Sequence, residues 1–312
     1  MHRGTRIAFI AVAASTAIAV PAASAVADPG PVPARQPDAP EPRPRLNAAP
    51  GGGVTNVAHR GASAYAPENT LAAVRLAKAQ RADVFEIDVQ ESKDHKLVLM
   101  HDTTLTRTTN VEKVYPKRAP WRVSDFTLAE IKRLDAGSWF AKKYKRERVP
   151  TLDQMLKAMR GQGLGLLLEI KSPALYPGIE KRIAASLKRS PSWLRHDPSE
   201  RRLAVQSFDR RSVRRFHSVM PRVPTGLLGK PKVKDLRKLA SYADQINPAY
   251  GDLTASYVKK VHAARMDVFT WTVNDRGQMR KAVQLGVDGI ITNRPDVLRR
   301  VLRESAPGSA AA

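Results

Sequence analysis

Apolar, strand-like runs alternate with helix-like segments through most of this 312-residue chain. Repeated helix-then-strand units over about 250 residues predict a parallel sheet covered by helices, most simply a single (β/α)8 TIM barrel of the α/β class. The strand-like runs are 54–58, 84–89, 97–100, 165–170, 203–207, 225–228, 245–247, 267–272 and 289–292, and the helical segments are 69–78, 151–160, 179–188, 211–218, 232–240, 255–264 and 277–285.

Two details depart from a regular barrel. The chain offers nine strand-like runs where eight are needed, and the link from Val89 to Leu97 is too short for a helical crossover between parallel strands. We therefore expect an extension, a hairpin or an irregular strand around strands 2 and 3. A long polar stretch follows His101, from 103 to 150, and predicts an elaborated loop at that point.

The two ends of the chain differ in composition from the middle. Residues 1–27 hold a basic start, a short apolar run and an A-x-A site, the pattern of a secretory signal peptide. Residues 28–53 are rich in Pro, Ala and Gly and read as a disordered linker. Residues 54–303 are the expected folded domain, and 304–312 a flexible tail. A cleaved signal peptide predicts a secreted protein, extracellular or in the cell envelope.

The chain has no cysteine and a net charge of +24, from 53 basic and 29 acidic residues. Without disulfides, stability must come from the core, which 250 residues can supply. The excess positive charge predicts contact with an anionic cell-wall or membrane surface; a solvated basic surface explains it equally well. Nucleic acid is not expected, because no binding motif is present and aromatics are only 6% of residues.

Two strand-like runs carry paired charges at alternate positions. Glu86 and Asp88 lie two apart, so their side chains share one face, which is the interior of a barrel. Glu169 and Lys171 repeat the pattern at the end of another run, where barrel enzymes place their active sites. Three carboxylates from two strands suit one hard divalent cation, Ca²⁺ or Mg²⁺. The alternative is an internal salt-bridge cluster, for instance Lys171 with Glu86.

His59 and His101 each close a strand-like run beside these carboxylates. Two imidazoles that titrate near neutral pH suggest a proton-transfer pair, one acting as base and the other as acid, in an order that the sequence leaves open. Arg60 would clamp a phosphate oxygen, with Lys171 as a second cation. Together these residues predict metal-assisted cleavage of a phosphate ester.

Further residues at strand ends could shape the site. Phe208 and Trp271 are candidates for an apolar wall around the substrate's alcohol group, with core packing an equally good explanation. Glu68 and Asn69 could brace the site from behind, and Asn69 or Thr70 could cap the following helix.

The spaced motifs HRG, PENT, E-x-D and HD, followed by LLLEIK, VQSF, INPAY, FTWTVN and DGIITNRP, resemble the glycerophosphodiester phosphodiesterases from about residue 56 to 298. The resemblance implies a TIM barrel like that of the phosphatidylinositol phospholipases C. It also implies hydrolysis of a glycerophosphodiester to glycerol 3-phosphate and an alcohol. By position it makes His59 and His101 the acid/base pair, Glu86, Asp88 and Glu169 the metal ligands, and Arg60 and Lys171 the phosphate-binding cations.

Two other functions stay open at this point. One is a related barrel that cleaves intact lipid, either like phospholipase D or at phosphatidylinositol. The other is a non-catalytic binder of anionic wall or lipid phosphates, although a binder has no need for two histidines. The substrate's head group, the choice between Ca²⁺ and Mg²⁺, cleavage of wall polymers and the oligomeric state do not follow from the residues.

Overall fold

The computed structural model describes residues 53–195 and 203–305. The predicted signal peptide and all of the predicted linker except Gly53 lie outside the described residues. So do residues 306–312 of the predicted tail. Within the described ranges, no helix combines the length and hydrophobicity that crossing a bilayer requires.

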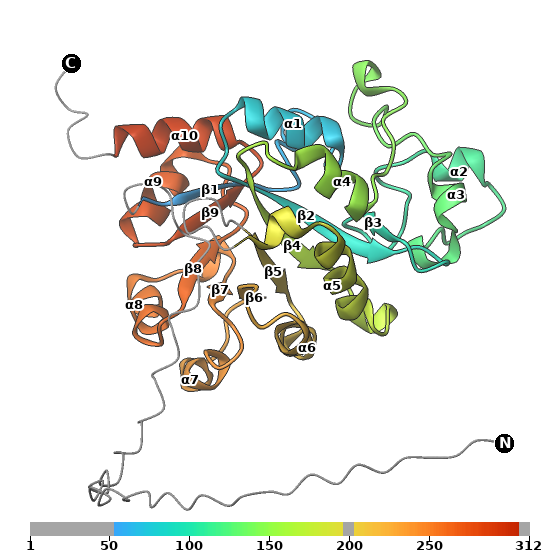
Figure 1. Cartoon of the computed structure of the whole chain (residues 1–312). Coiled ribbons are helices and arrows are strands. Elements are labelled where there is room, and N and C mark those ends of the chain that lie inside the picture. The colour runs from blue at the N-terminus through green and yellow to red at the C-terminus, as the bar shows by residue number, and fades with distance from the viewer. Residues whose placement is uncertain (1–52, 196–202, 306–312) are drawn as a thin grey trace, which may run out of the picture. The chain divides into compact units, whose positions relative to one another are not determined.

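Eight parallel strands form a closed barrel, as the sequence predicted (Figure 1). Neighbouring strands pair in parallel, and β1 closes the ring because it pairs with both β2 and β9. The barrel strands are β1 (Thr55–Ala58), β2 (Val84–Glu91), β4 (Gly165–Ile170), β5 (Leu203–Ser207), β6 (Thr225–Leu228), β7 (Gln245–Asn247), β8 (Asp267–Thr270) and β9 (Gly289–Thr292).

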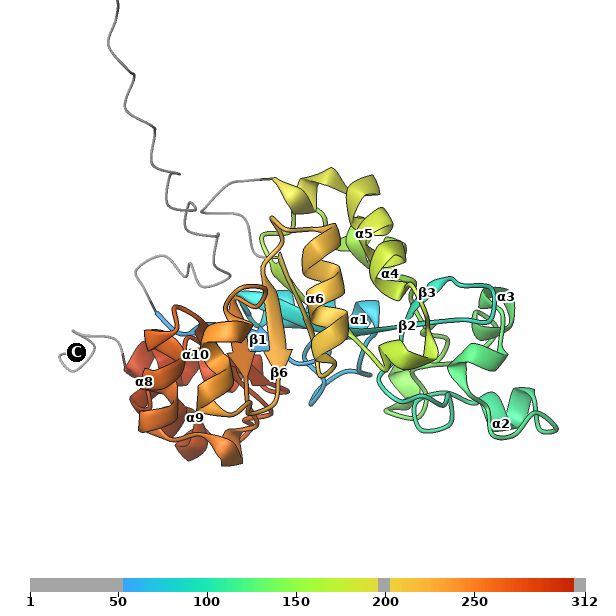
Figure 2. The same ribbon diagram turned by 90° about the horizontal axis from the view of Figure 1, so that it is seen from below.

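Each barrel strand is followed along the chain by a helix that packs on the outside of the barrel (Figures 1 and 2). The last of these helices was not predicted; it starts at Pro295, a residue favoured in a helix's first turn. These helices are α1 (Leu71–Ala79), α4 (Leu152–Met159), α5 (Ile179–Arg189), α6 (Arg210–Val219), α7 (Leu236–Leu239), α8 (Ala255–Ala263), α9 (Arg276–Gln284) and α10 (Pro295–Glu304).

The ninth strand explains the irregularity expected around strands 2 and 3. Strand β3 (Leu97–Leu99) pairs antiparallel with the end of β2, with Val89 opposite Leu99 and Glu91 opposite Leu97. The short link is therefore a hairpin, and β3 extends the sheet without entering the barrel.

The segment after β3 is an insertion with a core of its own, beside the ring of helices (Figures 1 and 2). It contains the short helices α2 (Val111–Val114) and α3 (Leu128–Ile131) and two 3-10 turns, η1 (Val123–Asp125) and η2 (Lys142–Tyr144). The expected elaboration is present, and it is more than a polar loop. Its core combines Val98 of β3 with Met100, Leu105, Val111, Val123, Phe126, Ile131, Leu134, Ala136 and Val149 of the insertion.

Side chains along each strand point alternately into the barrel and out towards the helices. On β2, Phe85 and Ile87 belong to the apolar core beneath the helices, whereas Val84 belongs to a separate small cluster inside the barrel. Glu86 and Asp88 share the phase of Val84, so they continue its inward face. The interior cluster consists of Val57, Val84, Leu167, Ala204, Phe269 and Ile291. Ile291 also lines the cavity described below, so this apolar layer forms the floor beneath the charged residues.

Candidate active site

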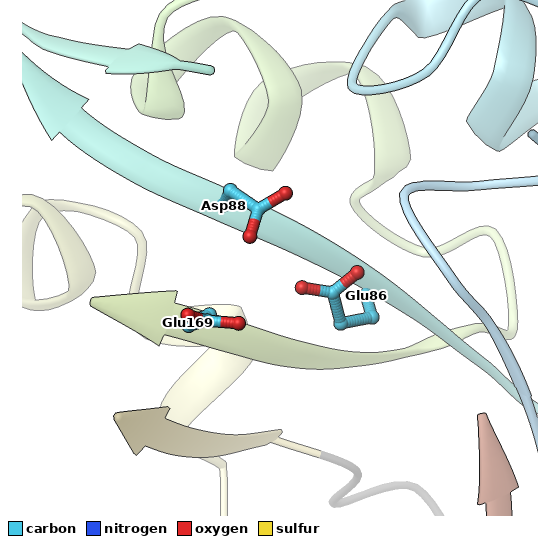
Figure 3. A group of neighbouring side chains, drawn as sticks. All are labelled: Glu86, Asp88 and Glu169. Atoms are coloured by element: carbon cyan, nitrogen blue, oxygen red, sulfur yellow. The ribbon is translucent and has the colours of Figure 1, made fainter. Parts of the chain in front are cut away.

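Three carboxylates meet inside the barrel (Figure 3). Glu86 and Asp88 come from β2 and Glu169 from β4, and the strand register places Asp88 opposite Glu169. One oxygen from each residue lies within 4.8 Å of the other two. Their residues are only 1%, 1% and 7% exposed. The sequence therefore predicted correctly that these side chains come together.

The carboxylates fit a divalent cation better than a closed salt-bridge cluster. Lys171 Nζ lies 2.9 Å from Glu169 Oε1 and 3.8 Å from Asp88 Oδ1, and no ion pair joins it to Glu86 among the described residues. Glu86 Oε1 and Asp88 Oδ1 are buried without a hydrogen-bond partner. Buried carboxylate oxygens without donors are costly unless a cation binds them, and an all-oxygen site suits Ca²⁺ or Mg²⁺.

Without a cation, the three buried carboxylates repel one another, which shifts their pKa values. Burial, with the nearby charge of Asp88, raises the pKa of Glu169 to about 7 against the pull of Lys171. Burial and the charges of Asp88 and Glu169 likewise raise the pKa of Glu86. Burial would also raise the pKa of Asp88, but Arg60 and Lys171 outweigh it and hold that pKa below its usual value. The site thus holds protons that a cation would displace.

Arg60 contacts three acidic residues, Glu86, Glu68 and Asp88. Its backbone N–H donates to Glu86 Oε2 at 2.8 Å, and its Nη1 donates to Glu68 Oε1 at 2.9 Å. Its Nε lies 3.3 Å from Asp88 Oδ2. Asn69 holds Asp88 from the other side, donating to Oδ2 at 2.8 Å and accepting the Asp88 N–H at 3.0 Å. Glu68 and Asn69 thus contact the site residues from behind, while Thr70 caps α1.

His59 has a neutral partner. Its Nδ1 lies 2.7 Å from the side-chain oxygen of Asn293, which follows β9. An amide oxygen only accepts, so Nδ1 carries the proton and Nε2 keeps a free lone pair. Burial, together with the charge of Arg60, lowers the pKa of His59 to about 4. The ring is therefore neutral at physiological pH, the state a proton acceptor requires.

His101 has a charged partner. Its Nδ1 lies 2.7 Å from Asp102 Oδ1. Burial would raise the pKa of Asp102, but hydrogen bonds from Arg107 and His101 lower it to about 2, so this carboxylate is ionised. A carboxylate on Nδ1 fixes the tautomer and stabilises the imidazolium when it forms.

Arg107 links Asp102, the partner of His101, to Glu68, the partner of Arg60. Its Nε donates to Asp102 Oδ2 at 2.6 Å, and its two terminal nitrogens donate to the two oxygens of Glu68 at 2.8 Å each. Because Glu68 also binds Arg60, alternating charges run from His101 to Asp88. The insertion that carries Arg107 is thereby tied to the entrance of the barrel.

Gln90 supports the backbone at His101. It is fully buried on β2, and its Nε2 donates to the carbonyls of Met100 and Asp102 at 2.7 Å each and of His101 at 3.2 Å. The Tyr176 hydroxyl donates to Gln90 Oε1 at 2.8 Å and so sets which end of the amide faces the loop.

A cavity of about 280 Å³ opens over these residues at the carboxyl ends of the strands. Phe208 and Trp271 form one wall, with ring centroids 5.5 Å apart and nearly perpendicular rings. Phe208 is 52% exposed, so it does not serve core packing. Eight predicted site residues line this cavity: His59, Arg60, Glu86, His101, Glu169, Lys171, Phe208 and Trp271. Asp88 lies just behind them.

Several residues that contribute to the site were not predicted from the sequence. Gln90 continues the alternate charged positions Glu86 and Asp88 by one step, and that phase could have revealed it. Asp102 directly follows His101, and Arg107 comes five residues later. Asn293 lies within the motif DGIITNRP, but its contact with His59 gave no local signal, because only the closing of the barrel brings the two together across 234 positions.

Comparison with known proteins shows which family this chain belongs to. The model of the glycerophosphoryl diester phosphodiesterase family matches residues 59–297, which include every residue of the site. The chain belongs to this family. Membership makes it a phosphodiesterase and not a mere binder of phosphates.

Similar family members share most of the chain. A glycerophosphodiester phosphodiesterase of Bacillus subtilis is 36% identical over 262 residues, covering 80% of this chain and 86% of its own. One from Caldanaerobacter subterraneus is 36% identical over 251 residues, covering 80% and 97%. An Oleispira antarctica phosphodiesterase, solved in complex with the product sn-glycerol-3-phosphate, is 29% identical with a TM-score of 0.69 and covers 80% of this chain and 96% of that one.

Proposed function

We propose that this phosphodiesterase hydrolyses glycerophosphodiesters to glycerol 3-phosphate and an alcohol, with one divalent cation and two histidines of unlike roles. The family and the glycerol 3-phosphate bound in the Oleispira relative support the substrate class. The observation that carries the mechanism is the contrast between the histidines. Both line one cavity, His59 beside an amide and His101 beside a carboxylate.

Glu86, Asp88 and Glu169 would hold the cation, Ca²⁺ or Mg²⁺. Bound there, it would polarise the phosphate and make a nearby hydroxyl or water more acidic. Arg60 and Lys171 lie beside the carboxylates and line the same cavity. They would bind the non-bridging phosphate oxygens and stabilise the charge that develops as the phosphate reacts.

His59 is the better base of the pair. Its lowered pKa keeps it neutral, and Asn293 leaves Nε2 free to accept the nucleophile's proton. His101 is the better acid, because Asp102 on Nδ1 stabilises the protonated ring until Nε2 gives its proton to the leaving alkoxide. The nucleophile is either water or the glycerol hydroxyl next to the phosphate, the latter giving a cyclic phosphate intermediate.

The product set tests this assignment and its nearest alternative. We would incubate the chain from Asp28 onward, which retains every described residue, with glycerophosphocholine and separately with intact phosphatidylcholine and phosphatidylinositol vesicles. We expect the soluble diester to release glycerol 3-phosphate and choline, and the intact lipids to stay unchanged. Release of phosphatidic acid or of an inositol phosphate from vesicles, without turnover of the soluble diester, would instead assign a lipid-cleaving barrel.

We also propose that the protein is secreted, on the strength of the signal-peptide pattern in residues 1–27, and that its net charge of +24 brings it to anionic surfaces of the cell envelope. Amino-terminal sequencing of protein recovered from the culture medium tests the first point. A mature chain starting at Asp28 is expected, and retention of Met1 in a cytoplasmic fraction would contradict it.

A further inference from the structure

Exposed apolar side chains gather on one face of the barrel. Among the described residues, four large apolar side chains are strongly exposed. Three of them follow successive strands: Leu175 (54%) after β4, Phe208 (52%) after β5 and Val233 (44%) after β6. The fourth, Trp139, belongs to the insertion. Scattered exposed hydrophobics are ordinary, but three on consecutive loops of one face form a patch that calls for a partner.

These three loops are neighbours in space. Strand β5 pairs in parallel with both β4 and β6, so all three strands end at the same edge. Lys171 Nζ, from the loop after β4, lies 5.8 Å from the centre of the Phe208 ring. Arg210, at the start of α6, lies 3.4 Å from Asp235 in the turn that contains Val233. The arrowhead of β6 points to this face (Figure 2).

The patch also borders the catalytic mouth. Phe208 lines the active-site cavity and stacks edge-on against Trp271. Anything that covers Leu175 and Val233 therefore lies beside the opening through which the substrate enters.

Basic residues flank two of the three apolar side chains, Phe208 and Val233. The segments 208–211 and 229–235 hold five basic residues, Arg210, Arg211, Lys230, Lys232 and Lys234, against two acidic ones, Asp209 and Asp235. Both carboxylates are already engaged: Asp209 caps α6, and Asp235 pairs with Arg210. The exposed side chains of Lys232 and Lys234, on either side of Val233, form no ion pair with the described residues.

We propose that this rim patch, made of Leu175, Phe208, Val233, Lys232 and Lys234, docks the catalytic face onto an anionic lipid bilayer. Apolar side chains would enter the head-group region while the lysines contact lipid phosphates, the pattern of proteins that lie on a membrane. A hydrated polyanion would use the lysines but has nothing to offer the three apolar side chains, so the lipid surface fits better.

Docking in this orientation opens the active site onto the bilayer surface. The enzyme would then meet phosphodiesters produced or held at that surface before they diffuse away. This use of the patch rests on the proposed function, whereas the docking itself does not depend on the chemistry.

The test is co-sedimentation of the chain from Asp28 onward with vesicles. One set contains equal parts of phosphatidylcholine and phosphatidylglycerol, and the other contains phosphatidylcholine alone. Two variants change the patch outside the catalytic cavity: Leu175→Ser with Val233→Ser, and Lys232→Gln with Lys234→Gln. A matched control, Lys259→Gln with Lys260→Gln, removes two exposed charges from α8 instead. Glycerol 3-phosphate release from soluble glycerophosphocholine is measured for every protein.

We expect the parent chain to partition onto the anionic vesicles and to be released by high salt. Each rim variant should bind about tenfold more weakly or worse, and the control within about twofold of the parent. Turnover of the soluble diester should be unchanged in all of them. Absent turnover in the parent would contradict the proposed function without touching the partition result.

Three results would overturn the docking proposal. One is a parent chain that ignores anionic vesicles. Another is equal binding by the rim variants and the control. The third is loss of binding in the lysine variant alone, with full competition by soluble polyphosphate, which would assign the patch to a hydrated polyanion.

Discussion

Gln90 donates a hydrogen bond from Nε2 to the backbone carbonyl of His101 at 3.2 Å, from a fully buried position behind the loop that carries His101. The same nitrogen binds the carbonyls on either side, of Met100 and Asp102. Since Gln90 does not line the cavity, any effect it has on turnover must pass through the position of His101.

Replacing Gln90 with Leu should therefore lower kcat about tenfold or more while KM changes less than about twofold, since a misplacement of about 1 Å is costly to catalysis. Tyr176→Phe, which removes only the hydroxyl that orients the amide, should show the same split more weakly. Steady-state kinetics on glycerophosphocholine checks this. The matched control is Gln245→Leu, another fully buried glutamine in the barrel. If both Leu variants lowered kcat equally, Gln90 would have only a structural role.

The unlike partners of the two histidines predict unlike responses to the leaving group. His101→Ala should lose about 10²- to 10⁴-fold in kcat on glycerophosphocholine, because choline leaves as a poor alkoxide that needs a proton. On a glycerophosphodiester with a nitrophenol leaving group, which needs none, most of that loss should disappear. His59→Ala should be impaired on both substrates alike. The opposite pattern would exchange the roles of acid and base.

Asp102→Asn should lower kcat by about 10²-fold or more, because an amide on Nδ1 allows the wrong tautomer of His101 and no longer stabilises its positive charge. The substitution conserves shape but removes a charge that pairs with Arg107 and His101, so the melting temperature should fall while the protein still folds. Arg107, which also binds Asp102, should keep the side chain in place through Glu68. Wild-type kcat in Asp102→Asn would show that His101 works without its carboxylate.

Cation binding should stabilise the fold more at pH 7.5 than at pH 5. In the cation-free protein the pKa of Glu169 is raised to about 7, above its ordinary value of 4.5. Between pH 4.5 and about 7 the folded state holds a proton on Glu169 that the unfolded chain releases. The free energy of unfolding therefore falls as the pH rises through that window. A cation replaces the proton and restores the lost stability. Melting temperatures with EDTA and with Ca²⁺ or Mg²⁺ measure this, and a shift independent of pH would contradict it.

Glu169→Gln provides the control for that measurement. An amide cannot titrate, so the fall in stability between pH 4.5 and 7 should shrink and the cation-induced shift should weaken with it.

The barrel, the inward carboxylates and the two strand-end histidines could be predicted from the sequence, because local patterns in the sequence indicate each of them. Alternation placed Glu86 and Asp88 on one face, and the strand ends marked His59 and His101. Side-chain partners from distant segments could not be predicted, because only closure of the ring brings Asn293 to His59. The core of the insertion was also missed, since its apolar residues are spaced irregularly among many charged ones.

The last measurement tests the carboxylate site and the reaction together: glycerol 3-phosphate release from glycerophosphocholine after EDTA treatment, and again after adding Ca²⁺ or Mg²⁺. We predict that EDTA abolishes the release and that one of these cations restores it. In Glu86→Gln the same cation concentration should not restore it. Full release in EDTA, or equal release by Glu86→Gln, would contradict a cation held by Glu86, Asp88 and Glu169.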